Sequence, residues 1–498
     1  MAATTLYLLT ALIALTSYIL NRLLVNHRIL RALNIPGPIL AKLSSKWLII
    51  TFARGEQMNT IHSLHARHGS IVQIGPKEIS FASARACKDI YSVNSRCLKS
   101  PIYDNLGKPG LVGMRDKEQH RERLKRVSHV FAPSVLRELE PGLQAQIQKL
   151  VALIAKNEGR GFDIVKPSRM LALDIAGEVF LGGDFGALGA KEGEEPHYVQ
   201  VMGLLIPYRG LETDVPWLLP LLKLLPFKRV KDFLGVVDYI YGFGEERVKQ
   251  SIERYGRSAR RKDLLTKFLV GDPEKGTLPL SDQEIADEVS NFIYAATDTT
   301  GVILSYFLYE MAANASWQEK LRQELEEARV REKGFEYNAI KQVPLLHACV
   351  YEVLRMHPGV GIGLPRITPQ EGWMIDGIFI PGGVVVHTPT YTIQRNPSAF
   401  PTPDSFNPLR WLSSSDTKCA FAPTAEMQSH MFVWGGGEHV CAGMNMAVME
   451  IKIVAVRVLC EFKIRVESEQ THKDMQMGDH FISEPKGGKG LCIFEKIE

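Results

Sequence analysis

Apolar residues recur at helical spacing along much of the chain. Segments 143–156, 281–300 and 321–328 place them three or four positions apart, which is the period of an amphipathic helix. The pattern changes between residues 366 and 392, where β-branched runs alternate with glycine and proline, as in "GWMIDGIFIPGGVVVHTPTYT". That pattern predicts short strands joined by turns. We therefore expect a mainly α fold with a small β-sheet portion.

The N-terminal pattern is different, because residues 6–20 form an almost uninterrupted apolar run, "LYLLTALIALTSYIL". A helix needs roughly 20 mostly apolar residues to span a bilayer, and "LLV" extends this run past Asn21 and Arg22. Basic residues follow the run and none precedes it. The positive-inside rule then predicts an uncleaved transmembrane anchor helix with the rest of the chain in the cytosol. A cleaved signal peptide is the alternative, disfavoured by the missing basic segment before the run.

Breaks in the pattern divide the chain. We assign residues 1–25 to the membrane anchor and residues 26–45 to a proline-rich hinge, since the prolines of "NIPGPIL" cannot continue a helix. No repeat or convincing linker divides residues 46–498, so we predict one large domain there. Within it, residues 201–230 are rich in Leu, Pro and Trp, and form either core or an apolar lid that touches a bilayer surface.

Charge and cysteine content narrow the class of protein. The 498 residues carry a formal net charge of +4, which is too small to indicate nucleic-acid binding. No C-x-x-C pair occurs among the cysteines, which argues against a disulfide framework and fits a reducing compartment. The seven cysteines are Cys87, Cys97, Cys349, Cys419, Cys441, Cys460 and Cys492.

One of these cysteines lies in an unusual setting, "FVWGGGEHVCAGMNMAVMEIKIVAVRVL", which begins at Phe432. Three glycines precede Cys441, and an almost wholly apolar helix, hence a buried one, follows it. A lone cysteine is usually a small buried side chain, but near a helix N-terminus loop amides stabilise its thiolate. A buried thiolate needs a cation. Because His439 is the single nearby residue that suits a metal, a haem iron with axial Cys441 fits best.

A second candidate is the polar cluster "TDTTG", residues 297–301. Ser281 and Glu284 form a capping box, so a helix begins there and continues through the cluster. Hydroxyls that bond back to the preceding turn, or an inserted water, would bend the helix here. The cluster is either an exposed polar face or, as the apolar residues around it favour, a buried acid beside a hydroxyl. Asp298 and Thr299 then suit proton delivery.

Paired charges mark a third motif. In "EVLR" the Glu352 carboxylate and the Arg355 guanidinium lie three residues apart, on one face of an apolar helix. A buried pair needs a third partner to complete its hydrogen bonds, and Arg410 of "FNPLRW" is the candidate. We interpret these three residues as structural.

A fourth motif is the basic stretch "HRERLKR", residues 120–126. The usual place for such a stretch is a solvated helix face. The basic side chains of this stretch, together with Lys452 on the helix after Cys441, would attract an acidic protein partner to the side of the molecule where Cys441 lies.

Together these motifs resemble the cytochrome P450 family. "WGGGEHVCAG" is similar to its haem-binding signature F-x-x-G-x-R/H-x-C-x-G. Gly437, Cys441 and Gly443 match, His439 occupies the Arg or His position, and Trp434 replaces the usual Phe. "AATDTT" is similar to the family's oxygen-activation motif, and "EVLR" with "PLRW" to its E-x-x-R and P-x-R motifs. The resemblance runs from the anchor to the last residues.

The resemblance implies how a haem would be held. Cys441 would be the axial ligand of the haem iron. His439, His120 and Arg366 of "LPRITP" would contact the haem propionates. Leu124 stands where the family usually has an arginine, so Arg123 or Lys125 would replace that contact.

The resemblance also assigns the other motifs. Asp298 and Thr299 would be catalytic, delivering protons for oxygen activation. Glu352, Arg355 and Arg410 would form the family's structural triad. Substrate contacts would come from residues 101–111, 201–230, 359–365 and the surroundings of Phe481.

The resemblance implies a fungal-type microsomal monooxygenase. The segment "PRITPQEGWMIDGIFIPGG" is similar in sequence to members of that group. We expect one haem b, O2, and electrons from an NADPH–cytochrome P450 reductase, with cytochrome b5 as an optional donor. The substrate would be a lipophilic secondary metabolite such as a terpenoid, polyketide or alkaloid, which is hydroxylated, epoxidised or oxidised in several steps. The chain would be single-pass in the endoplasmic reticulum membrane, with its catalytic domain facing the cytosol.

Two other functions stay open. One is a P450-type isomerase or dehydratase that does not use O2, and the acid–threonine pair argues against it. The other is a non-catalytic haem sensor, which would consume no O2 with any ligand.

Overall fold

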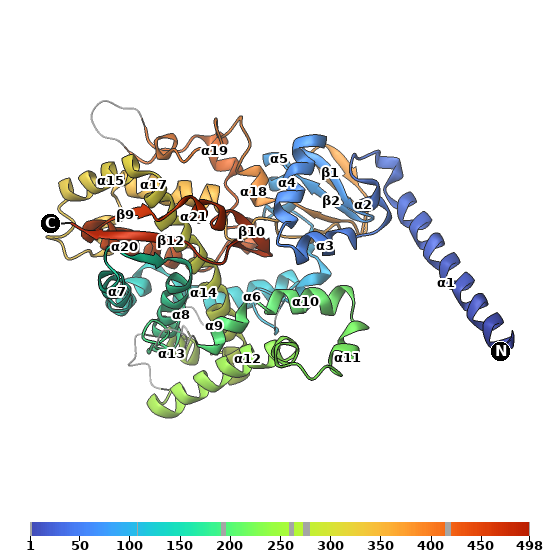
Figure 1. The fold of residues 1–498 in the computed structure, drawn as a ribbon, viewed down its shortest axis with the longest axis horizontal. Coiled ribbons are helices and arrows are strands. Elements are labelled where there is room, and N and C mark those ends of the chain that lie inside the picture. Colours follow the sequence, from blue (N-terminus) through green and yellow to red (C-terminus); the bar gives the residue numbers. More distant parts are fainter. Residues whose placement is uncertain are drawn as a thin grey trace.

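The structure is a computed structural model that describes residues 2–106, 108–190, 196–257, 263–271, 279–413 and 420–497. Figure 1 shows a mostly helical body, a smaller β-rich part beside it, and one long helix that projects away with the N-terminus. The predicted mainly α fold with a small β portion is confirmed. Gly107, inside the predicted substrate-contact range 101–111, and Cys419 lie outside the described residues.

Helices make up most of the described chain. The α-helices are α1 Ala2–Ile29, α2 Ile39–Leu43, α3 Trp47–Ala53, α4 Gln57–His68, α5 Ala84–Tyr91, α6 Lys117–Val127, α7 Pro133–Lys156, α8 Val165–Leu181, α9 His197–Met202, α10 Leu205–Asp214, α11 Leu218–Leu222, α12 Lys228–Tyr255, α13 Leu264–Val270, α14 Asp282–Ala313, α15 Ala315–Glu327, α16 Tyr337–Ile340, α17 Pro344–Met356, α18 Thr390–Ile393, α19 Ala425–His430, α20 Met444–Glu461 and α21 Glu469–Asp474. The 3-10 helices are η1 Arg31–Leu33, η2 Pro101–Asn105, η3 Ser128–Phe131, η5 Pro408–Trp411 and η6 Gly437–His439.

In the described residues the strands form four small sheets. They are β1 Ile71–Gly75, β2 Glu78–Phe81, β3 Leu98–Lys99, β4 Gly161–Asp163, β5 Arg366–Ile367, β6 Trp373–Ile375, β7 Ile378–Ile380, β8 Val385–His387, β9 Phe462–Val466, β10 Met477–His480, β11 Ile482–Pro485 and β12 Leu491–Lys496. The largest sheet has the order β1-β2-β8-β5-β3, in which only β2 and β8 pair in parallel. The other sheets are β4-β12-β9, β10-β11 and β6-β7. The strands predicted between residues 366 and 392 are β5 to β8.

Helix α14 crosses the middle of the body (Figure 1). It begins where the capping box predicts, because Ser281 Oγ accepts from the Glu284 amide and the Glu284 carboxylate accepts from the Ser281 amide. Helices α8 and α12 pack along it. Gly301 permits the close approach of α8, since a Cβ there would lie 2.7 Å from the Cα of Arg169. This glycine therefore brings an arginine of α8 against the polar cluster of α14.

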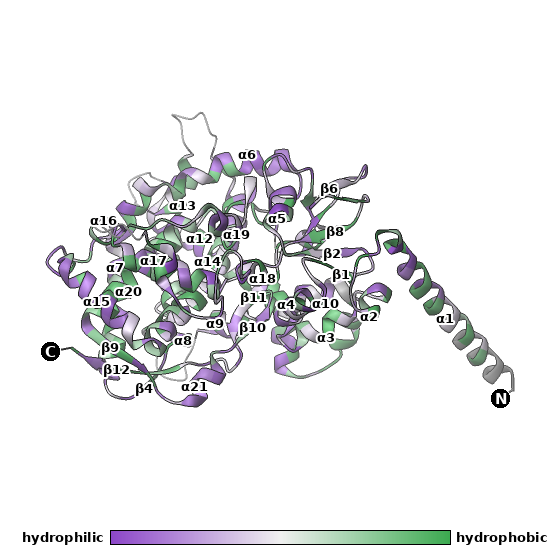
Figure 2. Cartoon of the chain, turned by 90° about the horizontal axis from the view of Figure 1, so that it is seen from above, coloured by the Kyte–Doolittle hydropathy of each residue, from purple (hydrophilic) through white to green (hydrophobic). Residues whose placement is uncertain are grey.

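Helix α1 projects from the body (Figure 1) and carries exposed apolar side chains such as Ile13, Leu20 and Leu24. Figure 2 shows hydrophobic and hydrophilic residues mixed along it. Within the described part of the chain, no helix is both long and apolar enough to cross a membrane. The predicted transmembrane anchor is therefore not supported in this part of the chain.

Candidate active site around Cys441

Cys441 lies at the wall of an internal cavity of about 320 Å3, which α14 lines with Ala295, Thr299 and Ile303 among others. The Cys441 side chain is exposed, and this exposure is to the cavity. Its backbone is fixed by the glycine loop, since the Cys441 amide donates to the Trp434 carbonyl at 2.8 Å.

The glycine loop passes against α5 at one point. Gly437 has a φ of +62°, and a Cβ there would overlap the Tyr91 carbonyl oxygen. No residue with a side chain fits this close approach in the left-handed region. The glycine is thus needed to hold the loop, and with it Cys441, at the cavity.

The protein alone does not stabilise the Cys441 thiolate. Burial raises the pKa of the Cys441 thiol, and the backbone amides of Gly443 and Met444 only partly oppose that rise. A thiolate at this position therefore needs a cation close to the sulfur.

Positive charge and N–H groups surround His439, which lines the cavity. His439 Nδ1 lies 3.1 Å from His120 Nε2, and Arg366 is close enough to act on both rings. Burial, together with the charges of Lys99 and Arg366, lowers the pKa of His120 to about 4 and that of His439 further. His120 Nδ1 is buried and finds no hydrogen-bond partner among the described residues. Such a cluster fits an anionic group, as the carboxylates of a haem would be.

Lys99 is part of this cluster and sequence reasoning missed it. It is buried on β3 and donates to the carbonyls of Leu111 (3.0 Å) and Val112 (2.8 Å). Burial and Arg366 lower the pKa of Lys99 to about 7. The one local signal is a lysine in the short segment "CLKS", where nothing else marks an anion site.

The predicted replacement of the family arginine by Arg123 or Lys125 is wrong. Arg123 turns towards α14, where it donates to Glu284 at 2.7 Å and lies 3.3 Å from Glu288. Lys125 is exposed and pairs with Glu122 on the same helix. The buried Glu288 and the partly exposed Glu284 of α14 hold Arg123 on this side, and the basic motif alone did not reveal that contact.

Lys452 also differs from its prediction. It is 1% exposed and donates to the Lys341 carbonyl at 2.9 Å. A lysine buried in this way is not on a docking surface, so the prediction that it steers a partner is wrong. The apolar helix α20 is buried nearly all round, and the ammonium reaches a backbone carbonyl instead of solvent.

Glu288 fixes a segment of the cavity wall. This fully buried carboxylate of α14 accepts from the Leu111 amide, 2.9 and 3.2 Å from its two oxygens. Lys99 holds the Leu111 carbonyl, so this peptide is clamped from both sides. Val112, the next residue, lines the cavity.

We expect Glu288→Gln to remove a pH dependence of stability. Burial raises the pKa of Glu288 from 4.5 to about 7, so its ionisation disfavours the folded state. Below pH 4.5 Glu288 is protonated in both the folded and the unfolded state and costs no stability. As the pH rises from 4.5 to 7 the unfolded state loses this proton first, so the free energy of unfolding falls by roughly 3 kcal/mol at most. Glutamine keeps an acceptor for Leu111 without the charge. Denaturant unfolding at pH 5 and pH 8 measures this, and an equal pH dependence in both proteins would contradict it.

Thr299 and Asp298 point to different sides of α14. Thr299 lines the cavity, and its hydroxyl donates to the Ala295 carbonyl at 2.7 Å. This is the bond to the preceding turn that the sequence predicts. Asp298 is buried and faces α8, where its Oδ1 lies 2.9 Å from Arg169 Nη2. Burial raises the pKa of Asp298 and the Arg169 charge opposes the rise.

The predicted charge cluster away from the cavity is assembled. Arg355 donates twice to Glu352, at 2.8 Å to each oxygen, and Arg410 Nε donates to the same carboxylate at 3.0 Å. Trp411 Nε1 (2.9 Å) and the Asn407 amide (3.0 Å) complete its shell. Burial alone would raise the pKa of Glu352, but these donors outweigh it and hold that pKa below its ordinary value. The cluster ties α17 to η5.

A family model decides the identity, since the one for cytochrome P450 matches residues 37–492. The chain belongs to the cytochrome P450 family. Tryprostatin B 6-hydroxylase of Aspergillus fumigatus is 30% identical over 90% of this chain and 78% of its own length. Cytochrome P450 monooxygenase FCK2 of Fusarium pseudograminearum is 27% identical over 91% and 79%. Cytochrome P450 monooxygenase tazI of Aspergillus terreus is 27% identical over 92% and 93%.

Family membership states the general chemistry. This cytochrome P450 is a monooxygenase that uses a haem iron and O2, receives electrons from a redox partner, and acts on a lipophilic molecule. The cavity beside Cys441 fits that chemistry, because its wall is mostly apolar and His439, which lies beside His120 and Arg366, lines it.

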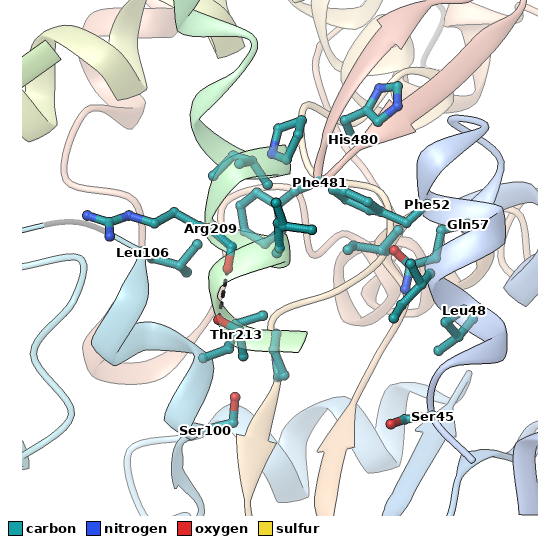
Figure 3. Close-up of a pocket in the computed structure, with 18 of the residues that line it drawn as sticks. Ser45, Leu48, Phe52, Gln57, Ser100, Leu106, Arg209, Thr213, His480 and Phe481 are labelled. Carbon is teal, nitrogen blue, oxygen red and sulfur yellow. Dashed lines mark hydrogen bonds between the residues drawn. The ribbon is translucent and has the colours of Figure 1, made fainter. Parts of the chain in front are cut away.

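The cytochrome P450 has a second, larger cavity of about 630 Å3 (Figure 3). Figure 3 shows His480 and Phe481 at the β10–β11 turn, near Phe52 of α3. Leu106, Ile206 and Phe481 line both cavities, so they stand between this outer cavity and the one at Cys441. Phe481 has a φ of +75°, which is strained for a residue with a side chain.

The segment 201–230 borders the outer cavity. Its start is core, since Leu205 and Ile206 are buried, whereas Trp217, Leu224 and Phe227 are exposed. The core alternative is therefore confirmed for the start of the segment, and the apolar lid stays a prediction for the exposed part. The exposed part lies at α11 and the turn into α12.

Proposed function

We propose that this cytochrome P450 is a haem-thiolate enzyme that inserts an oxygen atom from O2 into a lipophilic small molecule. One observation carries the proposal: Cys441, Thr299 and His439 line the same mostly apolar cavity, and His120 and Arg366 lie beside His439. A thiol that needs a cation and a cluster that needs an anion are both satisfied by one haem. The residues present therefore fit the cofactor.

Cys441 Sγ would be the axial ligand in this proposal. The propionates would be held by His439, His120 and Arg366, with Lys99 as a further partner. Gly437 and Gly443 would keep the loop close to the macrocycle. When bound, the haem supplies an O2-binding iron whose reactivity the thiolate enhances by donating electron density.

Thr299 and Asp298 would manage protons. The Thr299 hydroxyl can exchange its bond to Ala295 for one to a group in the cavity. Asp298, held by Arg169 on the α8 side, would bring protons to that hydroxyl after a rotation of its side chain. A positioned acid beside a hydroxyl is the arrangement that general acid catalysis needs.

The substrate class follows from the lining of the cavity. Its wall is mostly apolar, and Tyr241, Asn291 and Tyr294 supply a few polar groups. A lipophilic scaffold with one or two hydrogen-bonding groups would fit. We propose hydroxylation, epoxidation or stepwise oxidation of a fungal secondary metabolite, a terpenoid, polyketide or alkaloid, and the 6-hydroxylase named among the relatives supports hydroxylation.

The type of haem, the electron donor and the cellular location are proposals as well. We propose haem b, electrons from NADPH–cytochrome P450 reductase with cytochrome b5 as an optional donor, and the endoplasmic reticulum membrane as the location. Exposed Arg121 and Lys125 on α6 support docking of an acidic partner. Arg121 also contacts Glu438 of the loop that precedes Cys441, so this basic surface lies next to that loop. Apolar side chains exposed on α1 support membrane attachment of residues 1–25, with the domain 46–498 in the cytosol. Sedimentation with phospholipid vesicles, with and without residues 2–29, tests that attachment.

Thr299→Ala tests the catalytic proposal. Without the Thr299 hydroxyl, protons are no longer delivered to one position in the cavity. The product formed per NADPH should therefore fall about tenfold, and the peroxide formed per NADPH should rise correspondingly. Product, peroxide and NADPH are measured with reductase and a lipophilic compound that the wild type converts. Thr299→Ser is the matched control and should keep most of the coupling. Unchanged coupling in Thr299→Ala would remove the proposed role.

A further inference from the structure

Beyond Asp298, charged side chains continue in a line away from α14. Arg169 Nη2 lies 2.9 Å from Asp298 Oδ1 and 3.9 Å from Glu484 Oε2 of β11. The other Glu484 oxygen, Oε1, is 2.6 Å from His480 Nδ1. One guanidinium nitrogen thus stands between a buried carboxylate and a half-buried one.

The outer end of this line reaches the outer cavity. His480 lines that cavity and packs edge-on against Phe52, with ring centroids 5.5 Å apart (Figure 3). The hydrogen bond from His480 to Glu484 raises the pKa of the imidazole, so it carries a proton more readily near neutral pH. The side-chain exposure falls inward, from 35% for Glu484 to 21% for Arg169 and 5% for Asp298.

The inner end of this line, at Asp298 and Arg169, is closely packed. Gly301 is the residue that lets the Arg169 backbone approach α14, and β11 packs against the same helix. Asp298 Oδ1 and Arg169 Nε are both buried without a well-aligned hydrogen bond among the described residues. The Asp298–Arg169 contact is therefore a charge pair with weak alignment, and rotating Asp298 away breaks no ordinary hydrogen bond of Oδ1.

We propose that His480, Glu484 and Arg169 form a proton-supply chain from the outer cavity to Asp298, in which Arg169 is a positioning residue. The proposal rests on the function proposed above, since it assigns the source of the protons that Asp298 delivers. A structural ion-pair cluster is the alternative, and the experiment below separates the two.

The transfers balance in proton and charge. The His480 imidazolium gives its Nδ1 proton to Glu484 Oε1, and His480 becomes neutral. The Glu484 carboxyl passes a proton through a water molecule to the Asp298 carboxylate and is ionised again. His480 Nδ1 then takes up a proton that bulk solvent supplies through water in the outer cavity, so the net change is one solvent proton moved to Asp298. Arg169 keeps its charge throughout and holds the two carboxylates near one nitrogen; once Asp298 is neutral, their attraction weakens and its side chain can turn towards Thr299.

Two variants of the full-length holoenzyme test the chain, with reductase and a compound that the wild type converts. We expect Glu484→Gln and Arg169→Gln each to lower the NADPH-driven rate about tenfold and to enlarge the rate difference between H2O and D2O. Conversion driven by cumene hydroperoxide needs no delivered protons, so it should stay within about twofold. Arg169→Lys should recover most of the lost rate, because it restores the charge.

Lys486→Gln is the matched control, since Lys486 ends the same hairpin but pairs with Glu56 at 3.6 Å. It should leave both rates unchanged. If the hydroperoxide-driven rate falls together with the NADPH-driven rate, the residues are structural and the proposal is wrong. It is equally wrong if neither rate falls, or if Lys486→Gln lowers the NADPH-driven rate as much.

An infrared measurement tests the positioning role without turnover. Asp298→Asn identifies the carboxyl band of Asp298. Because the Arg169 charge lowers the pKa of Asp298, Arg169→Gln should increase the protonated band at pH 7. An unchanged band would overturn the positioning role of Arg169 even if the enzyme turns over. A wild type that binds no haem would contradict the proposed function, and this band would still show whether Arg169 and Asp298 interact.

Discussion

Cys441→Ser is expected to lower NADPH-dependent oxidation by at least about a thousandfold, because a serine hydroxyl cannot supply the thiolate that donates electron density to the iron. The substitution is nearly isosteric, and the side chain faces a cavity instead of packed core. The free energy of unfolding should therefore change by less than about 0.5 kcal/mol. Oxygen uptake with reductase, beside denaturant unfolding, measures both.

Cys460→Ser provides the control for this change. Cys460 is buried at the end of α20 and does not face the cavity, so its replacement should preserve the rate per folded enzyme. If Cys441→Ser retained a tenth or more of the wild-type rate, Cys441 would not be the ligand that matters.

Glu352→Gln is expected to lower the free energy of unfolding by about 3 to 5 kcal/mol. The carboxylate is fully buried between Arg355 and Arg410 and accepts from Trp411 as well. Glutamine removes the negative charge, which leaves two buried guanidinium groups uncompensated, and its amide N–H meets donors. Denaturant unfolding measures the loss, and we expect little holoenzyme to accumulate at 37 °C.

Glu332→Gln is the matched control for that change, because Glu332 pairs with Arg329 in the open, at 69% and 72% exposure. Exposed pairs of this kind contribute little, so the unfolding free energy should move by less than about 0.5 kcal/mol. A loss in Glu352→Gln as small as in this control would show that the buried triad does not hold α17 to η5.

Local signals in the sequence predicted what is local in the structure. The capping box at Ser281, the back-bonded Thr299 and the glycine loop before Cys441 each depend on residues a few positions apart. The trio of Glu352, Arg355 and Arg410 was predicted because a buried pair requires a third partner.

Contacts between distant segments could not be predicted in this way. Glu288 meets the Leu111 amide across 177 positions of sequence, and Arg169 reaches Asp298 only because Gly301 lets two helices approach. Lys99 likewise lies beside Arg366 only because the sheet pairs β3 with β5. Burial of these charges is a property of the assembled fold, so single motifs do not reveal it.

The spectrum of the dithionite-reduced wild-type protein, with and without CO, tests the central claim most directly. A thiolate opposite CO shifts the Soret band strongly to the red, and the account predicts that band for this chain. A band in the position given by a histidine ligand, or no haem in well-folded protein, would contradict it.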